Sequence, residues 1–245
     1  MAQLTNHAFA DRPAYDVAVS RAILERVAHG ELADTVRLAR PGAMVAFGKQ
    51  DVASPWFLEA VGAARAGGFD AVKRLAGGRA AVFHEDTVAF AWARATSDPW
   101  PGTHDRFREV ADIFERALKS LGVDARTSEI PGEYCPGEYS VNARGCTKLV
   151  GIGQRIVKGA SHIGGVIVVG GSERVRGVLI PVYEALGLDW DPDTTGSVEE
   201  EIGPVPFERA VAAVHEELSD GRDLEEAFLD EETLALAELL EPEHR

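Results

Sequence analysis

The sequence predicts an α/β protein in which helices cover one mixed sheet, and three observations lead to this class. Short apolar runs rich in Val, Ile and Phe occur in pairs around turn residues, as β-strands do. Amphipathic segments with helical spacing lie between the pairs. Strands and helices do not alternate strictly along the chain, which favours a mixed sheet over a doubly wound parallel one.

The spacing of apolar residues gives each element in order. Residues 14–29 carry apolar side chains on one helical face, and Gly30 follows as a stop. Residues 104–121 are the clearest helix, with apolar side chains at three- and four-residue steps. A helix over 173–187 contains Pro181, so we expect it to kink or to begin again there. Strands are expected at 35–40 and 43–47, at 79–83 and 88–94 as a pair, and at 148–157 and 162–169.

A change in composition near residue 190 predicts a domain boundary. Residues 189–207 are rich in Pro, Gly and acidic side chains and have no periodicity, so we expect a linker or a surface loop there. Two acidic helices are predicted after it, at about 207–219 and 222–240. The predicted division is a main domain at 1–190, a linker at 191–206 and an acidic helical extension at 207–245.

Composition excludes several classes of function. The net charge of -15 makes nucleic acid and anionic membranes poor partners. The sequence contains no run of 18 apolar residues and its start does not resemble a secretory signal, so we expect a cytoplasmic protein without a membrane span. The two cysteines are expected to be free thiols. They form no CxxC motif, so we expect neither a zinc site nor another bound metal.

The stretch GEYCPGEYSV places Cys135 in a turn ahead of Lys148. A cysteine attacks as the thiolate, and a cation across a hairpin favours that form. Either this cysteine or Cys146 could instead be merely structural. The following stretch, KLVGIGQRIVKG, has Gly151 and Gly153 inside a strand pattern, ahead of Gln154. Glycines there indicate either a ligand that approaches the backbone or a bulged edge strand.

A second candidate segment is KRLAGGRAAVFH, residues 73–84. The double glycine, Gly77 and Gly78, allows close approach of a ligand, and Arg74 and Arg79 could neutralise its carboxylate or phosphate. The alternative is an ordinary hairpin turn with solvated charges. His84 ends the segment.

Residues 139–172 contain no Asp or Glu but keep four basic residues, although 40 of the 245 residues are acidic. This pattern predicts a local electropositive face if the bases cluster. We expect Arg144, Arg155 and Lys158 to form a basic collar around Cys135, to which Lys73 and Arg79 could add.

The segments PGAMVAFGKQ, KRLAGGRAAVFH and KLVGIGQRIVKG together resemble the signature blocks of the lipoate-protein ligase A, octanoyltransferase and biotin-ligase superfamily. The stretch EYCPGEYSVNARGCTKLVGIGQR is most similar to the branch that moves octanoyl groups from the glycine cleavage H protein to other lipoyl domains. The resemblance implies a mixed, largely antiparallel sheet flanked by helices, with the core of class II synthetases and biotin–protein ligases. It departs from the branch at Ser140, where an Asp is usual, and in the spacing from cysteine to lysine.

By this resemblance the chain is a protein octanoyltransferase of lipoate biosynthesis. Cys135 becomes the acyl-accepting nucleophile, Lys148 stabilises the thiolate and the oxyanion, and the glycines wall an acyl tunnel. The substrate-binding residues are then Arg74, Gly77, Gly78, Arg79, His84, Gly151, Gly153 and Gln154. No cofactor is expected, and the partners are lipoyl domains of 2-oxoacid dehydrogenases, with the H protein or acyl-carrier protein as donor.

Two rival functions are compatible with the same residues. An ATP-dependent lipoate-protein ligase would use ATP and Mg²⁺ to form an acyl-adenylate, and Cys135 would be incidental. A non-catalytic subunit that binds lipoyl domains would form no acyl-enzyme at all.

Overall fold

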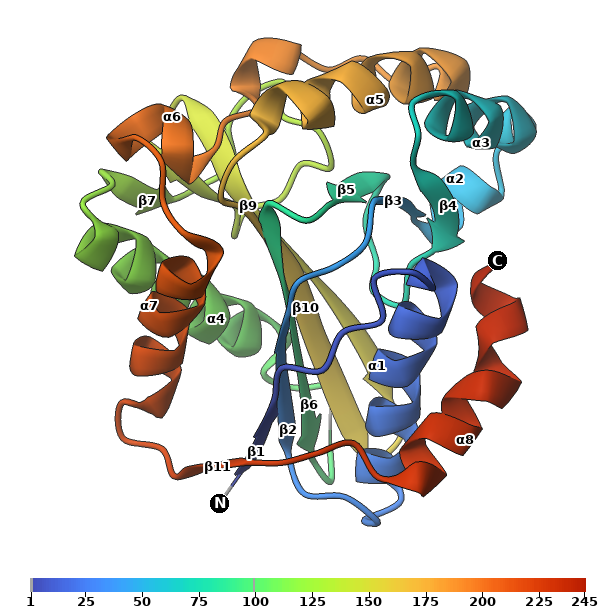
Figure 1. Cartoon of the computed structure of the whole chain (residues 1–245), viewed down its shortest axis with the longest axis vertical. Helices are drawn as coiled ribbons and strands as arrows, with labels where there is room; N and C mark the ends of the chain where they lie inside the picture. Colours follow the sequence, from blue (N-terminus) through green and yellow to red (C-terminus); the bar gives the residue numbers. More distant parts are fainter. Residues whose placement is uncertain (1, 99) are drawn as a thin grey trace.

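The computed structural model describes residues 2–98 and 100–245, and its centre is a sheet of eight strands (Figure 1). The strands β1 and β2 run parallel to each other, as do β1 and β11, and the remaining neighbours pair in antiparallel fashion. The prediction of a mixed, largely antiparallel sheet is therefore confirmed. In spatial order the strands are β11 (Leu224–Glu226), β1 (Ala2–Thr5), β2 (Thr35–Ala39), β6 (Thr87–Ala95), β10 (Ala160–Val168), β9 (Thr147–Val157), β8 (Val141–Ala143) and β7 (Ala125–Thr127).

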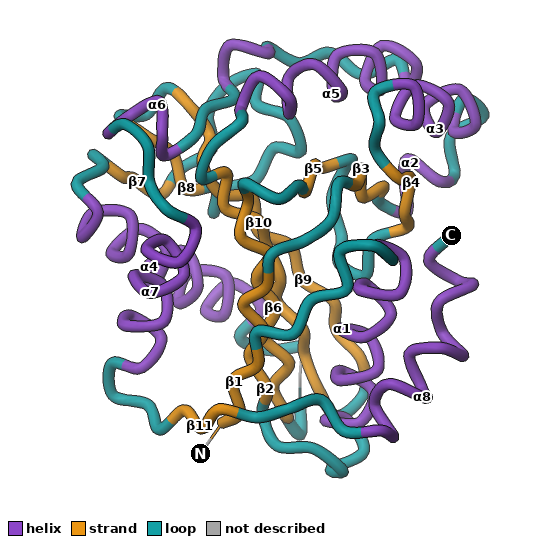
Figure 2. Tube along the Cα trace, viewed as in Figure 1, coloured by secondary structure: helices purple, strands orange, loops and turns teal. Residues whose placement is uncertain are grey.

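Helices cover both faces of this sheet (Figures 1 and 2). Side chains alternate between faces along β6, so Val88, Phe90 and Trp92 join α4 (Thr103–Leu121) and α7 (Phe207–Ser219) in the largest apolar core. The opposite face carries the alanines of β6 and packs against α1 (Pro13–Ala28), which in turn contacts α8 (Glu231–Leu240). Small side chains on this second face leave space between the sheet and α1.

A second, three-stranded sheet lies at one end of the large one. Its strands are β4 (Asp70–Lys73), β3 (Met44–Phe47) and β5 (Ala81–Phe83) in that order. Two helices, α3 (Phe57–Ala66) and α5 (Ser172–Leu186), pack against it in a separate apolar core, beside the short α2 (Lys49–Val52). Tyr134 and Cys135 belong to the same core, so the cysteine turn rests on the small sheet.

Several expected elements differ in the structure. The segments 79–83 and 88–94 were expected to pair, but β5 pairs with β3 and β6 pairs with β2 and β10, because the two segments belong to different sheets. The helix α5 continues through Pro181 and does not begin again there. The predicted loop at 189–207 contains a 3₁₀ turn, Pro192–Thr194, and α6 (Val198–Ile202).

The C-terminal segment is also more varied than one pair of helices. The expected helix at 222–240 is split, because β11 pairs with β1 and Asp230 then caps the N-terminus of α8 by accepting a hydrogen bond from Thr233 N at 2.8 Å. Both β11 and α8 contact the body of the protein. The division into 1–190, 191–206 and 207–245 stays a prediction.

The basic collar forms only in part, because Arg155 and Arg79 line the same cleft as Cys135 but Arg144 and Lys158 do not. Arg144 and Lys158 lie beyond opposite ends of β9, whose length of 11 residues separates them by roughly 30 Å. Arg144 is also paired with Glu201 at 2.8 Å.

None of the helices described is both long and apolar enough to cross a lipid bilayer.

Candidate active site

The cysteine turn lies in the loop between β7 and β8 and is fixed from two sides. The backbone N–H of Cys135 donates to Tyr183 Oη of α5 at 2.9 Å, and that hydroxyl donates to Ala80 O at 3.0 Å. The carbonyl oxygen of Cys135 accepts a hydrogen bond from Lys148 Nζ at 2.8 Å. The turn is therefore anchored to a helix, to the small sheet and to the large sheet, while the thiol remains half-buried.

Cys135 has a left-handed backbone conformation, with φ of +43°. A residue with a Cβ atom is strained in this region, and such strain is often found at functional positions. This backbone conformation directs the thiol toward the loop that connects β4 and β5.

A stability comparison tests this strain. We expect the free energy of unfolding of Cys135→Gly to be about 1 kcal/mol higher than that of Cys135→Ala, because glycine adopts positive φ without steric cost. Urea unfolding of both variants measures the difference. The matched control is Cys146, whose φ is not positive, so Cys146→Gly should be less stable than Cys146→Ala. The same order at both positions would contradict the interpretation.

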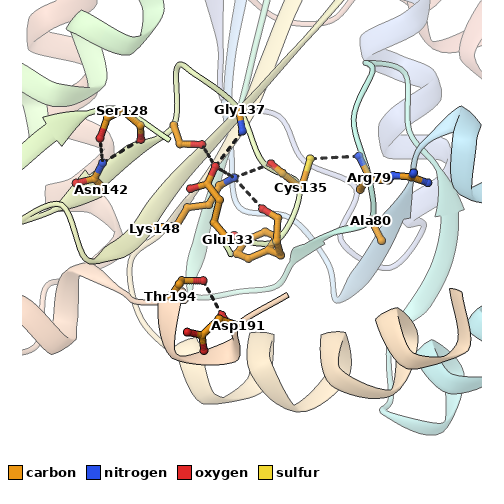
Figure 3. Close-up of polar contacts among 12 residues, drawn as sticks. Arg79, Ala80, Ser128, Glu133, Cys135, Gly137, Asn142, Lys148, Asp191 and Thr194 are labelled. Atoms are coloured by element: carbon orange, nitrogen blue, oxygen red, sulfur yellow. Dashed lines mark hydrogen bonds and ion pairs between the residues drawn. The ribbon is translucent and has the colours of Figure 1, made fainter. Parts of the chain in front are cut away.

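The thiol is surrounded by hydrogen-bond donors. Cys135 Sγ accepts from the backbone N–H of Arg79 at 3.2 Å and lies 3.7 Å from Arg74 Nη1 (Figure 3 shows the Arg79 contact). Both groups are donors directed at the sulfur. Gly78 makes the approach possible, because a Cβ atom there would lie 2.8 Å from the sulfur, and its φ is +112°. The double-glycine segment thus contacts the cysteine directly.

Arg74 and Arg79 are themselves held in place. Arg74 Nη1 donates to the carbonyl oxygen of Arg79 at 2.9 Å. Arg79 Nη1 donates to Asp51 Oδ1 at 3.2 Å, and Asp51, which is fully buried, accepts from Gly48 N through Oδ2 at 2.9 Å. Sequence reasoning missed Asp51, since the fold alone brings α2 next to this loop.

Lys148 is buried at the start of β9, and its ammonium group contacts the cysteine turn. Nζ donates to Glu133 Oε1 at 3.2 Å, to Tyr134 O at 3.0 Å and to Cys135 O at 2.8 Å (Figure 3). An ammonium has three donors, so each of them already has an acceptor in the protein. The lysine was expected to contact the sulfur and the oxyanion, but the groups next to the sulfur are instead Arg74 and the Arg79 N–H.

Glu133 is a further buried charge that sequence reasoning missed. Its Oε1 accepts from Gly137 N at 2.9 Å and from Ser140 Oγ at 2.6 Å as well as from Lys148. Its Oε2 is buried without a hydrogen-bond partner among the residues described. The only available signal was its position two residues before the cysteine. Ser140, which departs from the branch pattern, therefore has a partner in this glutamate.

An apolar cavity lies between the large sheet and α1, with a volume of about 90 Å³. That volume is several times the roughly 10–15 Å³ needed to hold one water molecule. The cavity exists because four neighbouring strands carry mostly small residues on this face, and their side chains do not fill the space between the sheet and α1. They include Ala39 on β2, Ala89 and Ala91 on β6, Gly164 on β10 and Gly151 on β9. Lys148, Arg74 and Cys135 lie at its wall.

A larger open cleft adjoins the apolar cavity, with a volume of about 860 Å³. Cys135 lines both spaces, as do Leu75, Ala76 and Ile152, so the cysteine stands where they meet. Of the predicted site residues, the cleft is lined by Gly77, Gly78, Arg79, Gly153 and Gln154.

His84 is not brought together with the other predicted residues. It is fully buried in the turn between β5 and β6, where its ring packs against Gly171, and it is absent from the linings of both spaces in the described part of the chain. Burial lowers the pKa of this imidazole. In residues 2–98 and 100–245, no group of three or more His, Cys, Asp or Glu side chains could hold a metal ion.

The fold is that of lipoate-protein ligases. A putative lipoate protein ligase from T. acidophilum superposes with a TM-score of 0.79 at 20% identity, covering 99% of this chain and 94% of that one. A lipoate-protein ligase A bound with ATP superposes with a TM-score of 0.78 at 18% identity, covering 98% of this chain and 94% of the other. The chain belongs to the lipoyl protein ligase A/B catalytic domain family, whose profile matches residues 12–221.

Relatives in sequence carry a more specific name. An octanoyl-[GcvH]:protein N-octanoyltransferase of Geobacillus kaustophilus is 28% identical over 170 residues, which are 69% of this chain and 60% of the relative. A protein of the same name from an Exiguobacterium species is 24% identical over 208 residues, 80% of this chain and 74% of the relative. The match thus spans less than two thirds of the first relative's length.

Proposed function

We propose that the chain is a protein octanoyltransferase that carries the acyl group on Cys135 and delivers it to the lysine of a lipoyl domain. The observation that carries the proposal is the position of the thiol. It lies between an apolar cavity and an open cleft, with an N–H group and a guanidinium directed at the sulfur. The names of the relatives in sequence support the same assignment.

The first half-reaction loads the enzyme. The thiolate attacks the carbonyl carbon of the donor's octanoyl group, the alkyl chain enters the apolar cavity, and a tetrahedral intermediate forms. Its oxyanion is stabilised by the Arg79 N–H and by Arg74 Nη1, which already point at the sulfur in the free enzyme. The Cys135 thiol has given its proton to solvent before the attack. The bond from the octanoyl carbon to the donor's nitrogen or sulfur then breaks, the leaving amine or thiol takes a proton from solvent, and Cys135 remains as an octanoyl thioester.

The second half-reaction unloads it. The neutral ε-amine of the acceptor lysine enters through the open cleft and attacks the thioester carbon. The C–S bond breaks, the cysteine leaves as a thiolate and the new amide loses a proton. Splitting the transfer into two steps lets one cavity hold the alkyl chain while donor and acceptor exchange in the cleft. The H protein and acyl-carrier protein are the proposed donors, and no cofactor takes part.

Lys148 and Glu133 position the nucleophile in this scheme. The ammonium holds the carbonyl groups of Tyr134 and Cys135, and the carboxylate holds the other end of the same turn through Gly137 N. Their charges compensate each other inside the protein, since both side chains are buried.

Intact-mass spectrometry after mixing the protein with octanoyl donors tests the proposal. We expect the mass of one octanoyl group to appear on the protein without ATP, and peptide mapping to place it on Cys135. Transfer to a lipoyl domain should then release it. An absolute requirement for ATP, with formation of AMP, would show a ligase instead. Octanoylation of the acceptor without any acyl-enzyme would also contradict the proposal.

A further inference from the structure

The apolar cavity extends across neighbouring strands of the large sheet, from β9 to β2. Its floor has two rows of residues that are paired across β2, β6, β10 and β9. One row is Ala39, Ala89, Val166 and Gly151, and the next is Arg37, Ala91 and Gly164, whose partner Gly153 on β9 lines the open cleft instead. Three strand spacings of about 4.8 Å give the rows a width of roughly 14 Å from β9 to β2. Cys135 stands at the β9 side, next to Lys148.

The end of the cavity at β2 is polar and rigid. Arg37 is buried there with Asp16 of α1, and Nη2 lies 2.6 Å from Asp16 Oδ1. The guanidinium also donates to Ser20 Oγ at 2.9 Å and to His7 O at 2.7 Å. With this many partners Arg37 cannot move aside without losing several buried hydrogen bonds at once. The cavity therefore has a fixed end.

His162 closes the cavity along the strand direction. It belongs to the next row of β10, opposite Ala93, but its ring bends back over the row above. A Cβ atom on Gly164 would lie 2.7 Å from His162 Nε2, so the imidazole occupies the space that this glycine leaves open. In contrast to Arg37, its Nδ1 has no hydrogen-bond partner among the residues that the structure describes. Packing against its neighbours, and not a hydrogen bond at Nδ1, holds the imidazole there.

We propose that the imidazole of His162, seated on Gly164 and backed by the Arg37–Asp16 pair, sets the length of acyl chain that the cavity accepts, at about eight carbons. An extended chain of that size spans roughly 9 Å, given carbon–carbon bonds of about 1.5 Å in a zigzag. The chain and its thioester linkage thus fill the distance from Cys135 to the polar end. A longer chain cannot extend past the ion pair, so its additional carbons must turn along the strands, where they meet the His162 ring.

The charge state of the ring is consistent with this role. Burial, with the nearby charges of Arg74 and Arg37, lowers the pKa of His162 to about 4. The imidazole is then neutral near pH 7, and a neutral ring can contact an alkyl chain without the cost of a buried charge.

The test compares acyl chains of different length on three variants. Simple thioesters of hexanoate, octanoate, decanoate and dodecanoate compete for acylation of the protein, and intact mass gives the relative rates. We expect the wild type to prefer octanoyl. His162→Ala should move the preference to decanoyl or dodecanoyl and raise the ratio of dodecanoyl to octanoyl at least about tenfold, because each buried methylene contributes about fourfold in affinity.

Two further variants separate length selection from general damage. His162→Leu keeps a side chain of similar size, so the octanoyl preference should remain. His244 is another buried histidine, and burial lowers its pKa as well. It lies on the C-terminal segment and does not line the cavity, so His244→Ala should leave the chain-length profile unchanged. An unchanged profile in a folded His162→Ala protein would overturn the inference. Tighter binding of ω-hydroxyoctanoate than of octanoate would also overturn it, because the end of the cavity would then bind a terminal polar group and would not simply limit the length of an alkyl chain.

The inference rests on the proposed function, but the two can fail separately. If neither these thioesters nor an octanoyl-loaded protein donor acylates the protein, the transferase proposal is wrong. Calorimetric titration with the free fatty acids of the same lengths then decides whether His162 limits the chain. A shift of the best-binding length in His162→Ala supports the inference without any turnover, and the same best length in both proteins contradicts it.

Discussion

Cys135→Ala is expected to abolish the acyl-enzyme and to slow octanoyl transfer by at least about 10³-fold, the scale on which covalent catalysts lose activity without their nucleophile. The thiol is the atom at which the apolar cavity and the open cleft meet, and it has the donors that a thioester intermediate requires. Single-turnover transfer from an octanoyl donor to a lipoyl domain measures the loss. Circular dichroism checks that the variant is folded.

The second cysteine of the chain is the matched control. Cys146 is exposed in the turn between β8 and β9, and its Sγ is 3.6 Å from the carbonyl oxygen of Arg144. Cys146→Ala should therefore keep both the acyl-enzyme and the transfer rate. Substantial transfer by Cys135→Ala, or an octanoyl group found on Cys146, would show that the acyl group takes another route.

The sequence was informative where function depends on local segments. The turn residues around Cys135, the glycines after Arg74 and the strand that begins near Lys148 could each be recognised from their own neighbours. The chain order of the three segments PGAMVAFGKQ, KRLAGGRAAVFH and KLVGIGQRIVKG then indicated the family. The structure confirms the mixed sheet and brings the three segments to one site.

The residues that were missed depend on contacts between distant parts of the chain. Asp51 reaches Arg79 across the edge of the small sheet. His162 and Arg37 line the same cavity only because the three strands β2, β6 and β10 pair in register. The role of Arg79 could not be predicted either, because its backbone N–H, and not its charge, contacts the thiol. Arg144 does not join the basic collar for a related reason, since Glu201, which lies outside the stretch, is its ion-pair partner.

The paired charges of Lys148 and Glu133 give the second large expected effect. Lys148→Met removes the cation and leaves the carboxylate buried without its partner, since both side chains are almost completely inaccessible. Breaking a buried ion pair on one side costs about 3–5 kcal/mol of folding free energy. The carbonyl groups of Tyr134 and Cys135 also lose their donor, so the cysteine turn should loosen and acyl-enzyme formation should fall with stability.

A double-mutant cycle separates the ion pair from a general loss of packing. In Glu133→Gln/Lys148→Met the amide oxygen can still accept from Gly137 N and Ser140 Oγ, and no charge remains buried. We therefore expect the double variant to be more stable in urea than Lys148→Met alone, although it carries one change more. Lys119→Met, which breaks an exposed pair with Glu115, should cost at most about 0.5 kcal/mol. Acylation should stay impaired in the double variant, because the two carbonyl groups still lack their donor. Additive losses in stability would mean that the two charges act independently, and full acylation in the double variant would mean that Lys148 serves only the fold.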